Sequence, residues 1–218
     1  MAVNHRRELA RRALAGFDHG LDATTRATAR ALAQLDNAEA VVLVEGISDQ
    51  IALETAARGR GRSLEAERVV VLPIGGAHAI GRILARLGNR RRLAGLCDLR
   101  EEEVFRRGLV AAQVGSPRTR SDLEQLGFFV CVSDLEEELI RGVGPAGTEA
   151  LFDSEDDLRS FRSFQSQPAW RGGETEAQLY RFVRSSSVRN LRYARLLVEA
   201  AVARNTLPRP LDALLAAV

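Results

Sequence analysis

The sequence predicts an α/β fold: a mainly parallel four-stranded sheet with helices on both faces, and helical segments at both ends of the chain. Two observations lead to this prediction. Short apolar runs alternate with segments of helical periodicity between residues 40 and 141, which is typical of consecutive β–α units. Hydrophobic residues make up 45% of the chain, enough to bury a core of mostly aliphatic side chains.

The individual elements follow from the spacing of apolar residues. Two helices are expected in the first 37 residues, separated by His19-Gly20. The run Val41–Val44 is continuous and rich in valine, as expected of a strand buried on both faces. The tail shows helical periodicity interrupted by Gly172-Gly173. The predicted strands span 40–44, 69–72, 93–97 and 128–132, and the predicted tail helices span 145–151, 154–165, 175–185, 189–204 and 208–217.

These patterns divide the chain into three parts. We expect an N-terminal helical segment over residues 1–37, an α/β domain over 38–141 and a C-terminal helical region over 142–218. No apolar run approaches membrane-spanning length, and the N-terminus lacks the apolar core and cleavage signature of a signal peptide. A cytoplasmic protein is therefore expected, in which Cys97 and Cys131 are buried free thiols.

Acidic residues follow the predicted strands where each strand ends. Glu45 follows the first strand, Asp98 follows the third, and Asp49 stands in the first turn of the helix after Glu45. Open parallel sheets bind ligands at the carboxyl ends of their strands, so these carboxylates are expected to converge. Carboxylate oxygens suit Mg²⁺ or Mn²⁺. The three residues therefore form a candidate metal site.

The segment Ser133-Asp134, after the fourth strand, has two interpretations. It can cap the following helix, through Ser133 with Glu136 or through Asp134 with Glu137. An acid directly after a strand can also serve the same site as the acids at the other strand ends.

The turn Gly75-Gly76, after the second strand, is also open to two interpretations. Its N–H groups could approach a phosphate at the N-terminus of the following helix. Alternatively, the glycines serve only the conformation of the turn.

The basic side chains are all arginine apart from three histidines, since the chain contains no lysine. The formal net charge of +2 is too even a balance to indicate a nucleic-acid partner by itself. Arginines recur at helical spacing in the tail, among them Arg189 and Arg192. They form either a solvated helix face or a phosphate-binding stripe.

Four motifs, VVLVEGISD, LPIGG, LAGLCD and FFVCVSDLEEEL, resemble a TOPRIM domain of the kind found in OLD-family (overcoming lysogenization defect) endonucleases. The resemblance covers about residues 38–141, and the tail is similar to the end of stand-alone proteins of that group. It implies a Rossmann-like sheet and Mg²⁺-dependent nucleotidyl transfer or hydrolysis on nucleic-acid phosphodiesters. No Walker A motif is present, so the ATPase half of full-length OLD proteins is missing and a separate ATPase could act as a partner.

The resemblance also implies roles for individual residues. Glu45 matches the TOPRIM glutamate, and Asp49 matches the second acid of the OLD-type first motif. Asp98 matches the first aspartate of the DxD motif, and Glu136 matches the late glutamate after the fourth strand. These four residues would bind metal and carry catalysis, with Glu102 completing the metal shell. Arg189 or Arg192 would contact a phosphate, and Gly75 and Gly76 would approach one.

Two positions depart from the family pattern. Arg100 stands where the second DxD aspartate is expected, and Glu101 or Glu102 could substitute for it. Asn190 stands where relatives carry a basic catalytic lysine. Both departures weaken the case for a full two-metal nuclease.

Three hypotheses follow for function. The first is a metal-dependent endonuclease acting on nucleic acid, with DNA as the expected partner. The second is a non-catalytic TOPRIM-like module that binds nucleic acid or protein and has a degraded metal site. The third is a receiver-like domain with a phosphoacceptor aspartate, which lacks the lysine that such a site uses.

Overall fold

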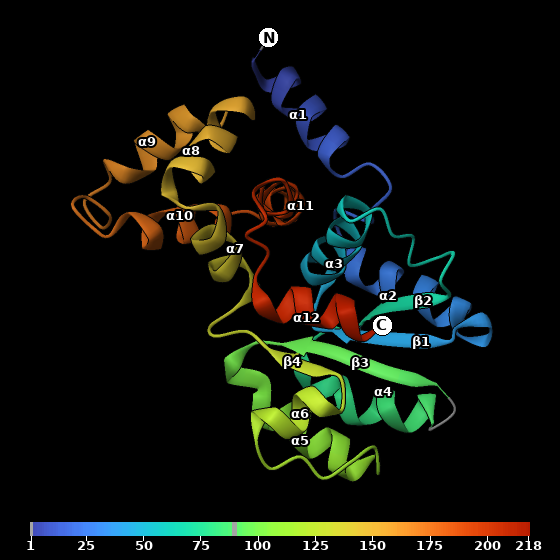
Figure 1. Cartoon of the computed structure of the whole chain (residues 1–218). Helices are drawn as coiled ribbons and strands as arrows, with labels where there is room; N and C mark the ends of the chain where they lie inside the picture. The colour runs from blue at the N-terminus through green and yellow to red at the C-terminus, as the bar shows by residue number, and fades with distance from the viewer. Residues whose placement is uncertain (1, 89–90) are drawn as a thin grey trace.

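The computed structural model describes residues 2–88 and 91–218, and its centre is a parallel sheet in the order β2-β1-β3-β4 (Figure 1). β1 lies between β2 and β3, so that Leu43 pairs with Leu72 on one side and with Gly95 on the other. The α/β sheet predicted from the sequence is confirmed, and the strand ends agree within two residues. The strands are β1 (Ala40–Val44), β2 (Val69–Pro73), β3 (Arg92–Cys97) and β4 (Phe128–Val130).

Both faces of the sheet are buried, because successive side chains of a strand point to opposite faces. Val41 and Leu43 lie in one core with α2, α4, α5 and α6, and Val42 and Val44 lie in another with α3, α7, α11 and α12. Figure 1 shows α4, α5 and α6 on one side of the sheet and α3, α11 and α12 on the other. These helices are α2 (Ala23–Gln34), α3 (Ile47–Gly59), α4 (Ile80–Leu87), α5 (Glu102–Ala111), α6 (Arg120–Gln125), α7 (Leu135–Val143), α11 (Ser187–Arg204) and α12 (Arg209–Ala217).

The tail adds an aromatic cluster to the core on the Val42 side. The ring centroid of Phe152 lies 5.1 Å from that of Phe161, 5.1 Å from that of Phe182 and 4.9 Å from that of Tyr193. All four rings are buried in the same core as the strands. The helices that contribute with α11 are α8 (Pro145–Ser154), α9 (Leu158–Gln165) and α10 (Thr175–Val183), and short 3-10 turns are η1 (Leu35–Asn37), η2 (Ala77–Ala79) and η3 (Leu99–Glu101).

Helix α12 lies against β3 and β4 and is fixed by two arginines from the loop after α3. Arg62 donates hydrogen bonds to the backbone carbonyls of Leu215 and Val218. Arg60 pairs with Asp212, with 2.5 Å between Nη2 and Oδ1. Residues near the end of the sequence therefore close a face of the sheet that is built much earlier in the chain.

The N-terminal helix α1 (Ala2–Ala13) leads into residues that pack beside α3. Leu14 and Phe17 share a small core with Ile51 of α3 and Leu191 of α11. Both terminal segments thus contribute to cores that include the central segment, and the three-part division of the chain stays a prediction. Among the described residues, no helix is both long and apolar enough to cross a membrane.

The two cysteines are buried free thiols, as predicted. Burial is the main cause that raises the pKa of both thiols, and neighbouring carboxylates raise it further. Neither thiol is therefore a reactive thiolate near neutral pH.

Candidate functional site

The carboxyl edge of the sheet gathers the acids singled out in the sequence. Glu45 directly follows β1 and Asp98 directly follows β3, while Asp134 precedes the first residue of α7. Because the strands are parallel, their carboxyl ends meet at one edge. Glu45, Asp49 and Asp98 are partly exposed there, and Asp134 and Glu136 are buried beside them.

Glu45 connects the ends of three strands. Its backbone carbonyl accepts hydrogen bonds from the N–H groups of Gly75 and Gly76, both at 3.1 Å. Its Oε1 accepts the N–H of Asp98 at 3.0 Å. The two glycines have φ angles of +75° and +105°, which side chains with a Cβ rarely adopt. Their N–H groups serve the turn after β2, so these contacts give no support to the predicted phosphate role of Gly75 and Gly76.

Asp49, in the first turn of α3, is directed back toward the end of β1. Its Oδ2 accepts the N–H of Gly46 at 2.8 Å. Burial, followed by the charge of Glu136, raises the pKa of the Asp49 carboxyl to about 8, although the bond from Gly46 acts to lower it. A carboxylate held in this place is therefore costly to ionise unless a cation is nearby.

Asp98 is in the same electrostatic situation. Burial raises the pKa of its carboxyl to about 8, and the charges of Glu45 and Asp49 raise it further. The pKa of Glu45 is also raised, by burial first, while the bond from Asp98 lowers it. Within the described ranges, none of these three carboxylates forms an ion pair. The site thus concentrates negative charge that the protein leaves uncompensated.

Asp134 and Glu136, at the start of α7, join Glu45, Asp49 and Asp98. We call these five residues the acid cluster. Asp134 caps the helix through Oδ1, which accepts the N–H of Glu137 at 2.9 Å, as in the second of the two capping alternatives, while the Glu137 side chain pairs with Arg141 instead of completing a capping box. Burial and then the charge of Asp134 raise the pKa of Glu136, whereas Arg184 and a hydrogen bond from the side chain of Asn190 lower it. The Asn190 Oδ1 atom is buried and has no hydrogen-bond partner. A free buried oxygen beside this cluster suits a bound cation or its water.

One cation does reach the acid cluster, and the sequence analysis did not single it out. Nη1 of Arg184, at the end of α10, lies 2.7 Å from Oδ2 of Asp134 and 4.0 Å from Oε2 of Glu136. It also donates to the hydroxyl of Tyr180 at 2.5 Å, and that hydroxyl in turn bonds Asp134. The i,i+4 spacing of Tyr180 and Arg184 places them on one helix face. No local pattern indicates that this face meets an acid far away in the sequence.

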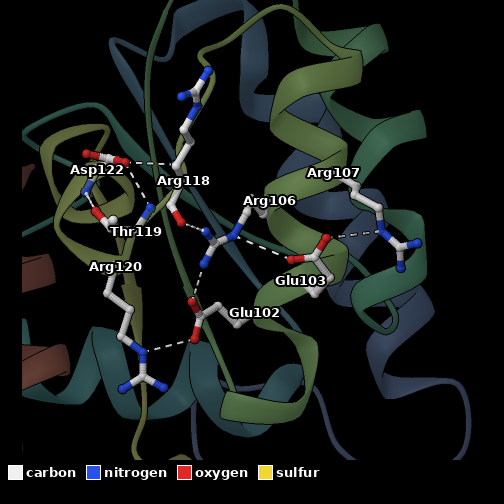
Figure 2. Close-up of polar contacts among 8 residues, drawn as sticks. All are labelled: Glu102, Glu103, Arg106, Arg107, Arg118, Thr119, Arg120 and Asp122. Carbon is white, nitrogen blue, oxygen red and sulfur yellow. Dashed lines mark hydrogen bonds and ion pairs between the residues drawn. The ribbon is translucent and has the colours of Figure 1, made fainter.

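Glu102 faces a different set of partners (Figure 2). Its Oε2 accepts Nε of Arg120 at 2.9 Å, and its Oε1 accepts Nη2 of Arg106. Arg106 also donates to the backbone carbonyl of Arg118, which ties α5 to the loop before α6. Glu102 is therefore engaged in a network of its own, and the structure does not bring its carboxylate together with those of the acid cluster.

Arg189 and Arg192 are likewise turned to other partners. Nη2 of Arg192 bonds Oδ2 of Asp157, and Nη1 lies 3.8 Å from Oε2 of Glu155. Arg192 is buried. Nε of Arg189 lies 3.5 Å from Oδ2 of Asp157, and its guanidinium stands 4.1 Å from the ring centroid of Phe182. These contacts give both arginines a packing role, and their predicted contact with phosphate has no support from the geometry.

The donor set fits a hard divalent cation, although a ready coordination sphere is not formed. Over residues 2–88 and 91–218, no group of three or more His, Cys, Asp or Glu side chains has the geometry of a metal site. Glu45, Asp49 and Asp98 nevertheless offer only oxygen donors, and burial, followed by the charges of neighbouring carboxylates, raises the pKa of Asp49 and Asp98 to about 8. Mg²⁺ or Mn²⁺ needs few protein ligands, since it keeps water and phosphate oxygens.

The chain thus has a parallel four-stranded sheet of order β2-β1-β3-β4, with acids directly after β1 and β3. Residues 38–91 match the family model "Overcoming lysogenization defect protein-like, TOPRIM domain", so this chain carries an OLD-like TOPRIM sequence in that segment. This match confirms the resemblance inferred from the sequence motifs, and it covers the first two of them, VVLVEGISD and LPIGG. Comparison with curated proteins gives no match.

Solved structures extend the similarity of fold to most of the chain. The C-terminal region of the Xanthomonas campestris pv. campestris OLD protein is 19% identical, with a TM-score of 0.57 over 83% of this chain and 94% of that one. The C-terminal region of the Burkholderia pseudomallei OLD protein is 18% identical, with a TM-score of 0.53 over 82% and 96%. At this identity the likeness concerns the fold, and it includes the helical tail as well as the sheet.

Proposed function

We propose that this protein is a metal-dependent endonuclease that hydrolyses phosphodiester bonds, with DNA as its substrate. One observation carries the proposal: Glu45, Asp49 and Asp98 come together at the carboxyl edge of a TOPRIM sheet without a cation of the protein to neutralise them. The match to an OLD-like TOPRIM domain supports the same reading.

In this proposal each residue has a defined task. Glu45, Asp49 and Asp98 would hold Mg²⁺ or Mn²⁺, and Glu136 would orient the shell together with Asn190. The bound ion supplies charge stabilisation to the phosphate oxygens during an in-line displacement. Glu45 is fixed through the backbone of Asp98, and Asp49 through Gly46, so both carboxylates are aimed before any ligand arrives. A cytoplasmic location and a separate ATPase partner remain predictions.

A supercoiled-plasmid assay with Mg²⁺ or Mn²⁺ tests this proposal. Glu45→Ala and Asp98→Ala should each abolish nicking. The matched control is Glu103→Ala, since Glu103 is an exposed carboxylate on α5 outside the acid cluster. Nicking that survives both substitutions, or that is lost equally in the control, would contradict the proposal.

A second candidate function is a non-catalytic module that binds nucleic acid. Arg100 favours it, because an exposed arginine stands at the second DxD position, where the family pattern has a metal-binding acid. Calorimetry separates the two: an intact protein that neither binds Mg²⁺ nor nicks DNA, yet still retains labelled DNA, would support the binding module instead.

A further inference from the structure

Arg184 has the features of a preset phosphate contact at the acid cluster. It follows α10, so the helical tail delivers it to the edge of the sheet, where Glu45 and Asp98 come from the strands. Asp134 and the Tyr180 hydroxyl both hold its Nη1 atom, at 2.7 and 2.5 Å respectively. The Tyr180 ring lies beneath the guanidinium, 5.1 Å from centroid to Cζ. The direction of this long side chain is therefore fixed before a ligand binds.

The other edge of the guanidinium is free. All of the contacts with Asp134, Tyr180 and Glu136 use Nη1, and Nε and Nη2 of Arg184 have no partner among the described residues. The side chain is 41% exposed. Arginine presents its N–H groups in a planar fork that matches two oxygens of a phosphate. Arg184 thus offers unused donors in the correct chemical form.

The charge balance of the site calls for such a contact. The cluster holds five carboxylates, and Arg184 is the one arginine, within the part of the chain that the structure describes, that pairs with any of them. A phosphodiester approaching these acids would be repelled unless cations meet it. The other tail arginines near this position, Arg189 and Arg192, are already paired with Asp157 and Glu155. The five carboxylates are those of Glu45, Asp49, Asp98, Asp134 and Glu136, and the charge of Glu101 acts on Glu45 in addition.

We propose that Arg184 binds the non-bridging oxygens of the substrate phosphate at the acid cluster through its free Nε and Nη2 edge. This inference rests on the proposed function for its substrate class. Tyr180 and Asp134 are positioning residues, because they hold the guanidinium without touching the phosphate themselves. The arginine would bind and orient the phosphodiester, and the acids would supply the metal.

Fluorescence anisotropy with a labelled 20-base-pair duplex, in Ca²⁺ instead of Mg²⁺ to suppress cleavage, tests the contact directly. Arg184→Gln should weaken binding about 10-fold, the scale of one charge-assisted hydrogen bond, and should lower the slope of log affinity against log salt by about one. Arg184→Lys should restore the salt slope but only part of the affinity. Tyr180→Phe, which keeps all charges, should cause a smaller loss of affinity.

The matched control is Arg181→Gln, which removes an exposed positive charge from the same helix. It should change affinity by less than about 2-fold, since a solvated arginine contributes only a general charge effect. Equal losses in Arg181→Gln and Arg184→Gln, or no duplex binding by the intact protein, would overturn the proposal. Circular dichroism melting of each variant shows whether a loss reflects unfolding. If Arg184→Gln is destabilised, the better-tolerated Arg184→Lys and Tyr180→Phe decide the matter.

The same variants in the Mg²⁺ nicking assay separate this inference from the proposed function. If Arg184→Gln specifically loses DNA binding and no protein nicks DNA, the proposed phosphate contact is supported and the proposed nuclease activity is contradicted. If Arg184→Gln nicks DNA normally at every DNA concentration, the proposed phosphate contact is contradicted and the proposed nuclease activity is supported. If both the phosphate contact and the nuclease activity are correct, Arg184→Gln should raise KM and also lower kcat, because a contact to the scissile phosphate acts in binding and in the displacement.

Discussion

Two clusters of buried charge in this protein have opposite balances. In the helical tail, Asp157 and Glu155 face Arg189 and Arg192, and the hydroxyl of Tyr193 bonds Asp157 at 3.2 Å. At the sheet edge, Arg184 pairs with Asp134 and Glu136, while Glu45, Asp49 and Asp98 form no ion pair within the described residues. Both clusters contain buried acids, Asp157 in the first and Asp134 and Glu136 in the second, so burial of acids does not by itself identify a functional site. The balance of charge is what distinguishes a structural ion cluster from a site that awaits a cation.

The largest effect is expected from breaking the balanced cluster. Asp157→Ala should lower the free energy of unfolding by about 3–5 kcal/mol, because it leaves the buried guanidinium of Arg192 without its main partner. Urea denaturation measures this loss. The control Asp153→Ala removes an exposed acid from the neighbouring helix and should stay within about 0.5 kcal/mol of the parent. A loss below about 1 kcal/mol for Asp157→Ala would mean that this cluster is not structural.

A substitution in the acid cluster at the sheet edge should instead raise the free energy of unfolding. The folded-state pKa of Asp49 is about 8, above its unfolded value, so its contribution to stability is present at low pH and is lost as pH rises toward 8. In EDTA, the free energy of unfolding of Asp49→Asn should therefore match that of the parent near pH 4 and exceed it at pH 9. The gain should be more than about 1 kcal/mol, the equivalent of one pKa unit.

Urea denaturation at the two pH values checks this prediction, and repeating it with Mg²⁺ sharpens it. A bound cation should stabilise the parent at pH 9 and leave Asp49→Asn with a smaller increase, because the variant lacks one ligand. If Asp49→Asn is less stable than the parent at pH 9 in EDTA, the acid cluster is not strained by its own charge.

The smallest effect is expected at Glu102, whose carboxylate pairs with partly exposed arginines (Figure 2). Glu102→Gln should cost no more than about 1 kcal/mol of stability, as for other pairs near the surface. Its Mg²⁺ affinity by calorimetry should equal that of the parent. A 10-fold loss of affinity would instead restore Glu102 to the metal shell that the family resemblance implied.

The sequence alone sufficed for the strands and for the acids at their ends. A buried parallel strand has a local signature, and a residue such as Glu45 or Asp98 takes its place in space from the strand that precedes it. The sequence also placed Asp134 after the fourth strand. It did not show whether its carboxylate caps α7 or joins the acids at the strand ends, because that depends on which groups the fold brings next to it.

The ion-pair partners of the arginines could not be predicted from the sequence in this way. An arginine side chain is long, so its partner depends on what the tertiary fold brings within reach. Arg184, Arg189 and Arg192 lie close together in the sequence, yet the first reaches Asp134 and the other two reach Asp157. The pairing of Glu102 with Arg120 similarly depends on the path of the loop before α6.

The position of α12 has a consequence for how the chain folds. Residues 209–217 cover part of a face whose strands begin at residue 40, so the native pairing of these segments closes a very long loop. Such a contact is entropically slow to form and raises the contact order of the domain. During synthesis, the apolar surface of β3 and β4 must remain open until α12 has left the ribosome. We expect this interval to favour aggregation of the chain, because apolar surface is exposed during it.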